Sequence, residues 1–170
     1  MKLFRFLTLL ALVALPALAD APLRIVKSDK GYLFSSQSNT SGYEFEVPGK
    51  TIRSSEKEGR IFAMIDGALV QILRVPAAQG KDEEALAAHR RSESAYLEKS
   101  GAVLAESAQC AALAIPHAEW RAELKDVSNS RYLTVKLDDS ILVLVVADNA
   151  TSPPGQAEQQ FSAICGSFHR

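Results

Sequence analysis

The chain has 170 residues, of which 47% are hydrophobic and 23% charged, and its formal net charge is −1. Such a balance leaves no basic excess to neutralise phosphates, which argues against a nucleic-acid partner. The length fits one domain that can bury a core without a metal staple.

The first 19 residues have the three parts of a cleaved export signal. Lys2 and Arg5 give a positive start, Leu7–Leu15 is apolar but too short to span a bilayer, and Ala17-Leu18-Ala19 suits a signal peptidase. We therefore expect cleavage after Ala19 and a mature protein that is periplasmic or secreted. No cysteine follows the cleavage pattern and no second apolar run is long enough, so we expect neither a lipid anchor nor a membrane span.

The first half of the mature chain has strand patterns. Asp20–Thr40 combines a short apolar piece, expected as an edge strand, with a polar stretch expected as a loop. Tyr43–Val47 alternates inward Tyr, Phe and Val with outward Glu, which predicts a half-buried strand. Arg60–Ile65 and Ala68–Val75 flank Asp66-Gly67, and this dipeptide predicts a tight hairpin.

A helix is predicted between Gly80 and Gly101. Asp82 is a plausible N-cap, and Gly101 sits where a helix can end in a left-handed residue. The residues expected to face inward recur at helical spacing: Ala85, Leu86, Ala88, Ser92, Ala95, Tyr96 and Leu97. Their small size indicates close packing on a sheet.

The second half adds further strands. Val103–Ile115 fits either two short strands with a turn or a short helix, whereas His117–Lys125 alternates like a half-buried strand with Trp120 inward. Tyr132–Leu137 also alternates, which places Tyr132, Thr134 and Lys136 on a wet face. Ile141–Ala147 is apolar throughout and predicts a central strand that is covered on both faces.

A closing helix is expected after the loop DNATSPPGQ. Ser152 is a candidate cap, with Pro153 or Pro154 in the first turn. The residues of its apolar face are Ala157, Phe161, Ile164, Cys165 and Phe168. The order of strands, helix, strands and helix predicts an α+β class, with residues 20–170 as a single domain. We expect an antiparallel sheet built from hairpins and flanked by two main helices.

The succession Gly42-Tyr43-Glu44-Phe45-Glu46-Val47-Pro48-Gly49, the hairpin at Asp66-Gly67, a helix, a second hairpin and a closing helix resembles the PsbP-like family. The resemblance covers about Gly42–Gly166. It implies a small envelope or lumenal protein with an antiparallel sheet between helices, a binding or assembly role and no catalytic residues. The chain departs from those bacterial members that carry a lipoprotein cysteine.

Cys110 and Cys165 are the only cysteines. In an oxidising compartment one possible pair favours a disulfide, which would contribute about 4 kcal/mol in the chain-entropy treatment. The alternative is two separate buried thiols that behave as small apolar residues.

The sequence offers little sign of reaction chemistry. His89, His117 and His169 have no metal-ligand spacing, and neither a nucleophile elbow, nor a phosphate-binding glycine loop, nor a Cys-x-x-Cys pair is present. We therefore predict no catalytic, cofactor or metal residue. His89, Arg90 and Arg91 form the one compact basic group in the middle of the chain, either a solvated helix face or a small anionic contact patch.

These observations favour a secreted or periplasmic, non-enzymatic binding or accessory protein with a protein partner. A periplasmic inhibitor, such as an immunity protein that blocks a toxin, is the alternative. A hydrolase whose residues are dispersed in the sequence is a third interpretation.

Overall fold

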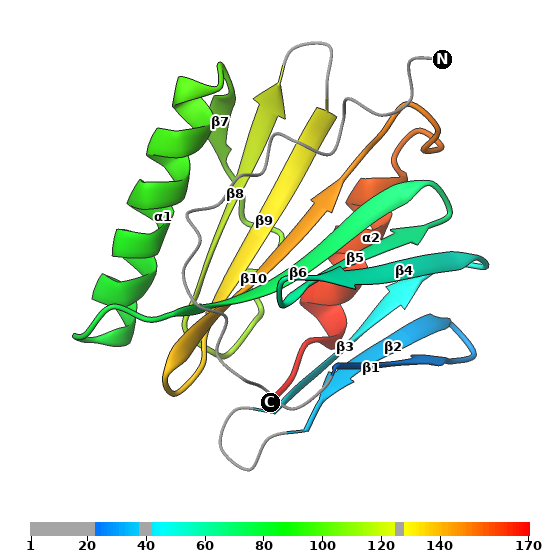
Figure 1. Cartoon of the computed structure of the whole chain (residues 1–170), viewed down its shortest axis with the longest axis horizontal. Helices are drawn as coiled ribbons and strands as arrows, with labels where there is room; N and C mark the ends of the chain where they lie inside the picture. Colours follow the sequence, from blue (N-terminus) through cyan, green and yellow to red (C-terminus); the bar gives the residue numbers. More distant parts are fainter. Residues whose placement is uncertain (1–22, 38–41, 125–127) are drawn as a thin grey trace.

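The computed structural model describes residues 23–37, 42–124 and 128–170; the expected export signal, residues 1–19, lies outside them. The elements, in chain order, are β1 (Leu23–Lys27), β2 (Gly31–Ser36), β3 (Tyr43–Pro48), β4 (Ile52–Lys57), β5 (Arg60–Ile65), β6 (Ala68–Pro76), α1 (Asp82–Lys99), β7 (Val103–Glu106), β8 (His117–Leu124), β9 (Ser128–Lys136), β10 (Ser140–Ala147) and α2 (Gln156–Ser167). Figure 1 shows α1 beside β7 and β8, with the strands β1–β3 at the opposite side of the molecule.

The strands form two antiparallel sheets. Seven strands pair in the order β4-β5-β6-β10-β9-β8-β7, and three pair in the order β1-β2-β3. The predicted α+β class is therefore confirmed, with a hairpin-built sheet and two main helices. Neither described helix has the length and apolar character that crossing a membrane requires.

The two faces of the seven-stranded sheet support separate cores. On one face Leu144 of β10 belongs to a cluster with Phe161 of α2, and on the other Val143 belongs to a cluster with Leu86 of α1. Every residue of β10 is buried, as predicted for a central strand. Because neighbouring residues of a strand point to opposite faces, this one strand contributes to both cores.

The three-stranded sheet lies on the α2 side. Phe34 of β2 stacks on Phe45 of β3 with ring centroids 5.2 Å apart, and Phe168 stacks on Phe45 at 6.0 Å. The same cluster includes Ala63 and Ile65 of β5, so this small sheet covers the β4–β6 half of the larger one. The prediction that Tyr43, Phe45 and Val47 point inward is confirmed.

The hairpin predicted at Asp66-Gly67 is confirmed, with β5 and β6 paired on either side of it. Both turn residues have positive φ, 48° and 92°, as a tight turn of this kind requires. The Asp66 carboxylate also accepts hydrogen bonds of 2.8 Å from the backbone N–H groups of Lys50 and Thr51. The side chain thereby fixes the turn against the segment that precedes β4.

Two strands were not predicted. Gly31–Ser36 forms β2, although Asp20–Thr40 was expected to contain one strand and a loop, and Ile52–Lys57 forms β4. In β4 only Ile52 is even partly buried, because this strand is at the edge of its sheet. An edge strand with few apolar residues lacks the alternation on which the prediction depends.

Helix α1 differs from its prediction at its start and on its face. Lys81 is the N-cap and makes no side-chain cap, while Asp82 is in the first turn. The expected inward residues Ser92 and Ala95 are exposed. Ala85, Leu86 and Leu97 are also among the expected inward residues, and their burial confirms that part of the prediction. The buried face of the helix is therefore narrower than expected.

Helix α2 begins later than expected. Gly155 with φ of 78° precedes its first residue, so neither Pro153 nor Pro154 is in the first turn. The Ser152 hydroxyl donates to the Gly67 carbonyl oxygen at 2.9 Å and does not cap the helix. The predicted apolar face is confirmed, since each of its residues is buried: Ala157, Phe161, Ile164, Cys165 and Phe168.

The wet face predicted for β9 is wrong. Tyr132, Thr134 and Lys136 are 1%, 0% and 7% exposed, because α1 packs over this side of the sheet. The Lys136 ammonium donates to the carbonyl oxygens of Leu137 and Asp138. The alternation in β9 therefore separates two faces that are both covered, and the polar residues on the α1 side are buried.

Candidate functional site

The predicted disulfide is present. The sulfur atoms of Cys110 and Cys165 are bonded, and the Cα atoms are 4.8 Å apart. Cys165 comes from α2, whereas Cys110 lies in the segment from 107 to 116, which follows the edge strand β7. The two alternatives for Val103–Ile115 thus resolve into one short strand followed by a loop. A disulfide fits an oxidising compartment.

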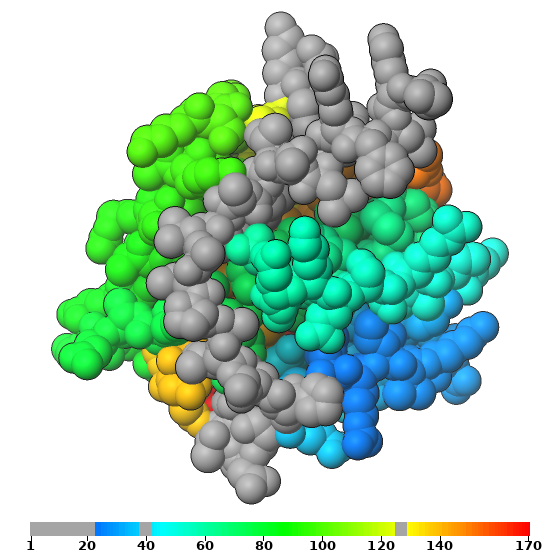
Figure 2. Space-filling model, viewed as in Figure 1, coloured from blue at the N-terminus to red at the C-terminus, as the bar shows by residue number. Residues whose placement is uncertain are grey.

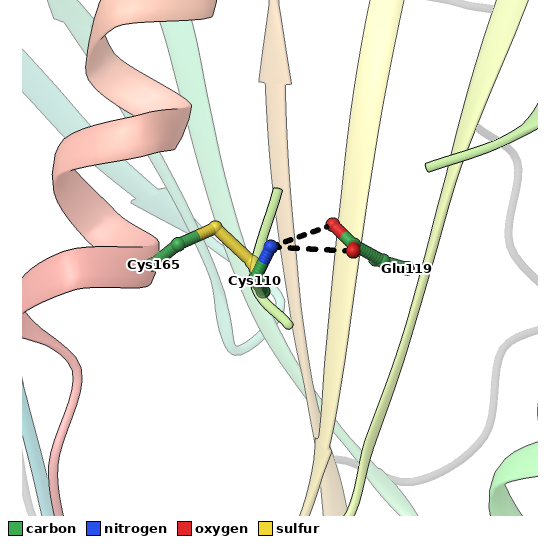
Figure 3. A group of neighbouring side chains, drawn as sticks. All are labelled: Cys110, Glu119 and Cys165. Atoms are coloured by element: carbon green, nitrogen blue, oxygen red, sulfur yellow. Dashed lines mark hydrogen bonds between the residues drawn. A yellow bond between two sulfur atoms is a disulfide. The ribbon is translucent and has the colours of Figure 1, made fainter. Parts of the chain in front are cut away.

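Glu119 of β8 lies beside the disulfide (Figure 3). Both of its carboxylate oxygens are 3.2 Å from the backbone nitrogen of Cys110, which donates to them. Only 8% of Glu119 is exposed. Among the described residues no other group donates to the carboxylate and no cation pairs with it.

A second contact joins the cysteine-bearing loop to α2. The Gln109 amide donates to the Glu158 carboxylate, which also accepts from Nε of Arg131 at 2.8 Å. Arg131 Nη1 lies 3.7 Å from the Asp148 carboxylate. The loop is therefore held at two neighbouring residues, one by Glu119 of the sheet and one by Glu158 of the helix.

The predicted contact group His89, Arg90 and Arg91 is divided by the helix. His89 turns toward the sheet, and burial lowers its pKa to about 4, so the ring is neutral near pH 7. Its Nε2 atom is buried and has no hydrogen-bond partner among the described residues. Arg91 is exposed. The basic group therefore does not form one continuous cationic surface.

Arg90 packs over the edge of the core on the α1 face, which includes Trp120. Its guanidinium lies 5.8 Å from the centre of the Trp120 ring and pairs with the Glu106 carboxylate. The hydrogen bond from Arg90 lowers the pKa of Glu106. A shallow hollow on the outer face of α1 includes both arginines; its lining residues are Ala87, Arg90, Arg91, Ser94, Ala95 and Glu98.

A polar group lies between α1 and the centre of the sheet. Burial, and next the nearby Glu93 carboxylate, raise the pKa of the Tyr132 hydroxyl, which bonds to the Ser130 side chain. Burial likewise raises the pKa of Glu93, although the charge of Arg60 opposes that effect. These residues come from α1, β9 and β5, so this group reaches from the helix toward the uncovered half of the sheet.

The β4–β6 patch lies on the α1 side of the sheet, beyond the helix; we define it by Phe62, Met64, Leu69, Arg53 and Lys57. Met64 pairs directly with Leu69 and with Arg53 across the strands. The three apolar residues are half-buried, and neither core cluster of the described residues includes them. Helix α1 packs mainly against β7, β8 and β9. Figure 2 shows side chains of β4 and β5 at the surface on the side where α1 lies.

Sequence reasoning missed Glu119 and the β4–β6 patch. Glu119 was placed on the polar side of an alternating strand, yet that side of β8 faces α2 and the loop from 107 to 116. One available signal was the closing helix, because a helix that packs on a sheet covers one side of the strands beneath it. The sequence contains no signal for the patch, because its residues come from three strands that only the pairing of the sheet brings together.

The only group of three potential metal ligands found within the described ranges is Cys110, Glu119 and Cys165. While the disulfide is intact, neither sulfur offers a thiolate to a metal. Of the other charged residues named above, Arg90 and Arg131 form ion pairs, whereas Arg53, Lys57 and Arg91 are exposed. Cys110, Glu119 and Cys165 therefore hold the loop from 107 to 116 against α2 and β8, and the disulfide is the reactive bond of this group.

No protein-family model matches the chain, and no curated protein matches it. The chain is similar to a protein from Bacteroides thetaiotaomicron VPI-5482 of known crystal structure, with 10% sequence identity and a TM-score of 0.42. The match covers 75% of this chain but only 44% of that one. Likeness at this level supports no statement about function, and the resemblance to the PsbP-like family stays a prediction.

Proposed function

We propose that the protein is an exported, non-enzymatic binding protein that holds an extended segment of a protein partner on its β4–β6 patch. The observation that carries this proposal is the position of Phe62, Met64 and Leu69, which lie together outside both core clusters of the described residues. Contiguous apolar side chains that are rimmed by polar ones are typical of surfaces that bind a partner.

The position of β4 supports an extended partner. It is an edge strand, so its outer backbone groups have no neighbouring strand among the described residues. A peptide that pairs with such an edge gains backbone hydrogen bonds and places alternate side chains on one face of the sheet. On β4 the residues of that face are Arg53, Ser55 and Lys57.

The charges of the edge indicate the chemistry of the segment. Arg53 and Lys57 are exposed, and neither forms an ion pair with another described residue. Apolar side chains of a partner would contact Phe62 and Met64, while acidic ones would meet the two cations. The proposed ligand is therefore an extended segment that carries apolar and acidic residues at every second position, so that both kinds of side chain face the patch.

Site-specific photo-crosslinking in the native host tests this function. A photoreactive benzoylphenylalanine replaces Phe62, a change that keeps the aromatic ring. The matched control places the same residue at Val103, which is 67% exposed on β7 at the opposite edge of the same sheet. We expect one dominant protein adduct from position 62 and none from position 103, and at least a fivefold loss of the adduct in the R53E/K57E background.

Three results would overturn the proposal. Equal adducts from positions 62 and 103 would mean that contacts at the patch are random. An adduct with the mass of a lipid or another small molecule would exclude a protein segment. Adduct formation that the charge reversal leaves unchanged would remove the role of Arg53 and Lys57.

A further inference from the structure

Glu119 is a buried carboxylate whose charge has little compensation. Its two oxygens share one neutral donor, the backbone N–H of Cys110, and only 8% of the residue is exposed. Glu158, by contrast, receives hydrogen bonds from Arg131 and lies near Arg121. Because a buried charge is costly unless it is paired, the surroundings of Glu119 suit an additional cation.

Two sulfur atoms lie next to this carboxylate. The ligand atoms of Cys110, Glu119 and Cys165 are all within 4.8 Å of one another (Figure 3). Ligands of a tetrahedral zinc ion at ordinary bond lengths lie about 3.3–3.8 Å apart. Opening the sulfur–sulfur bond and a shift of about 1–2 Å would therefore bring three ligands around one ion.

We propose that reduction of the Cys110–Cys165 disulfide converts this group into a binding site for one thiophilic divalent cation, of which Zn²⁺ is the physiological example. A dithiol reductant supplies the two electrons. One of its thiolates attacks a sulfur of the disulfide, which forms a mixed disulfide and releases one protein thiol. The second thiol of the reductant then attacks the mixed disulfide, which releases the other protein thiol and leaves the reductant as a cyclic disulfide. The protein gains two thiols. Both lose their protons as they bind the metal, and Glu119 supplies the third ligand.

The loop from 107 to 116 allows this change, since it contains neither helix nor strand. Oxidation excludes the metal and reduction admits it, so the site responds to the redox state of its surroundings. This inference does not depend on the β4–β6 patch, and either proposal can fail alone.

Cadmium titration tests the site, because cadmium bound to thiolate absorbs in the ultraviolet. The whole protein is reduced with dithiothreitol, freed of reductant without oxygen, and titrated with Cd²⁺; circular dichroism monitors the fold. We expect one Cd²⁺ per chain for the reduced protein and none for the oxidised protein. Glu119→Gln should weaken binding at least tenfold, whereas Glu123→Gln, at an exposed position of the same strand, should leave it unchanged.

Zn²⁺ should also protect both thiols of the reduced protein from alkylation, and this protection should weaken in Glu119→Gln. The proposal would be overturned by reduced protein that binds no Cd²⁺, by equal affinity in the Glu119 and Glu123 variants, or by equal uptake in the oxidised form. If reduction unfolds the chain, two free thiols could bind the metal without Glu119, and the two variants would then be indistinguishable. That outcome also rejects the site.

Discussion

The two faces of the seven-stranded sheet are built differently. The α2 face is covered by a helix and a second sheet over a large apolar cluster, and the Cys110–Cys165 disulfide joins its helix to the loop from 107 to 116. Glu119 and the Arg131–Glu158 pair are its polar contacts with that loop and helix. The α1 face is covered by one helix over β7–β9 and contains His89, Glu93 and Tyr132. The difference teaches that the larger apolar cluster and the disulfide of the α2 side provide stability, while the α1 side places titratable groups beneath its helix and leaves the β4–β6 patch beyond it.

The largest expected difference is between the losses of unfolding free energy when a phenylalanine is replaced on each of the two faces. Phe161 is 0% exposed in the α2 core, so Phe161→Ala should lower the free energy of unfolding by about 3–5 kcal/mol through lost contacts and a cavity. Phe62→Ala removes the same ring from the half-buried patch and should cost about 1–2 kcal/mol. Urea unfolding measures both values, and equal losses would mean that the patch is part of a core.

The disulfide should contribute the next largest effect, and its loss should loosen the α2 side most. The paired variant Cys110→Ser and Cys165→Ser should lower the free energy of unfolding by about 2–5 kcal/mol, because the unfolded chain gains freedom. Amide exchange should rise most in α2 and in the loop from 107 to 116, and least in α1. Uniform acceleration in both helices would contradict the separation of the two faces.

His89 should make the stability of the α1 side depend on pH. Its pKa is about 4 in the folded protein and near 6.5 in the unfolded chain, so the unfolded state binds the extra proton between these values. The His89 contribution is fully present above about pH 6.5. It should fall by about 2–3 kcal/mol as the pH drops toward 4.

The pH effect is best read as a difference between wild type and His89→Gln. Glu93, whose pKa is raised by burial, acts in the opposite sense, because its contribution is largest at low pH. Both proteins retain Glu93, so subtracting their free energies of unfolding isolates the histidine. Parallel curves between pH 4 and 7 would show that the ring is solvated in the folded state.

Much of the fold could be predicted because some segments report their surroundings directly. The apolar run of β10 indicated cover on both faces, and Asp66-Gly67 located a hairpin. The pairing of Cys110 with Cys165 followed from their number and from the expected oxidising compartment. Each signal is local or depends on a single pair, so no knowledge of neighbouring elements was needed.

The features that were missed depend on which helix or loop packs over a residue in the folded protein. Lys136 alternates like a solvated residue, yet α1 covers it and backbone carbonyl oxygens bind its ammonium. Glu119 has the same pattern and is buried by a loop that has no periodicity of its own. The edge strand Ile52–Lys57 lacks apolar alternation altogether. Alternation separates two faces of a strand, but it does not tell which face is wet.

The smallest expected effect separates two adjacent arginines at the border of the α1 face. Arg90 lies over the Trp120 ring, so Arg90→Ala should lower the free energy of unfolding by about 0.5–1 kcal/mol through the lost cation–π contact. Arg91 is exposed, and Arg91→Ala should change it by less than about 0.5 kcal/mol. Lysine at position 90 keeps the charge and should restore part of the loss, whereas neutral glutamine should not. Tryptophan fluorescence during urea unfolding reports the contact directly, because Trp120 is the only tryptophan. Equal losses for the two alanine variants would mean that Arg90 is as solvated as Arg91 and that its contact with Trp120 does not stabilise the α1 face.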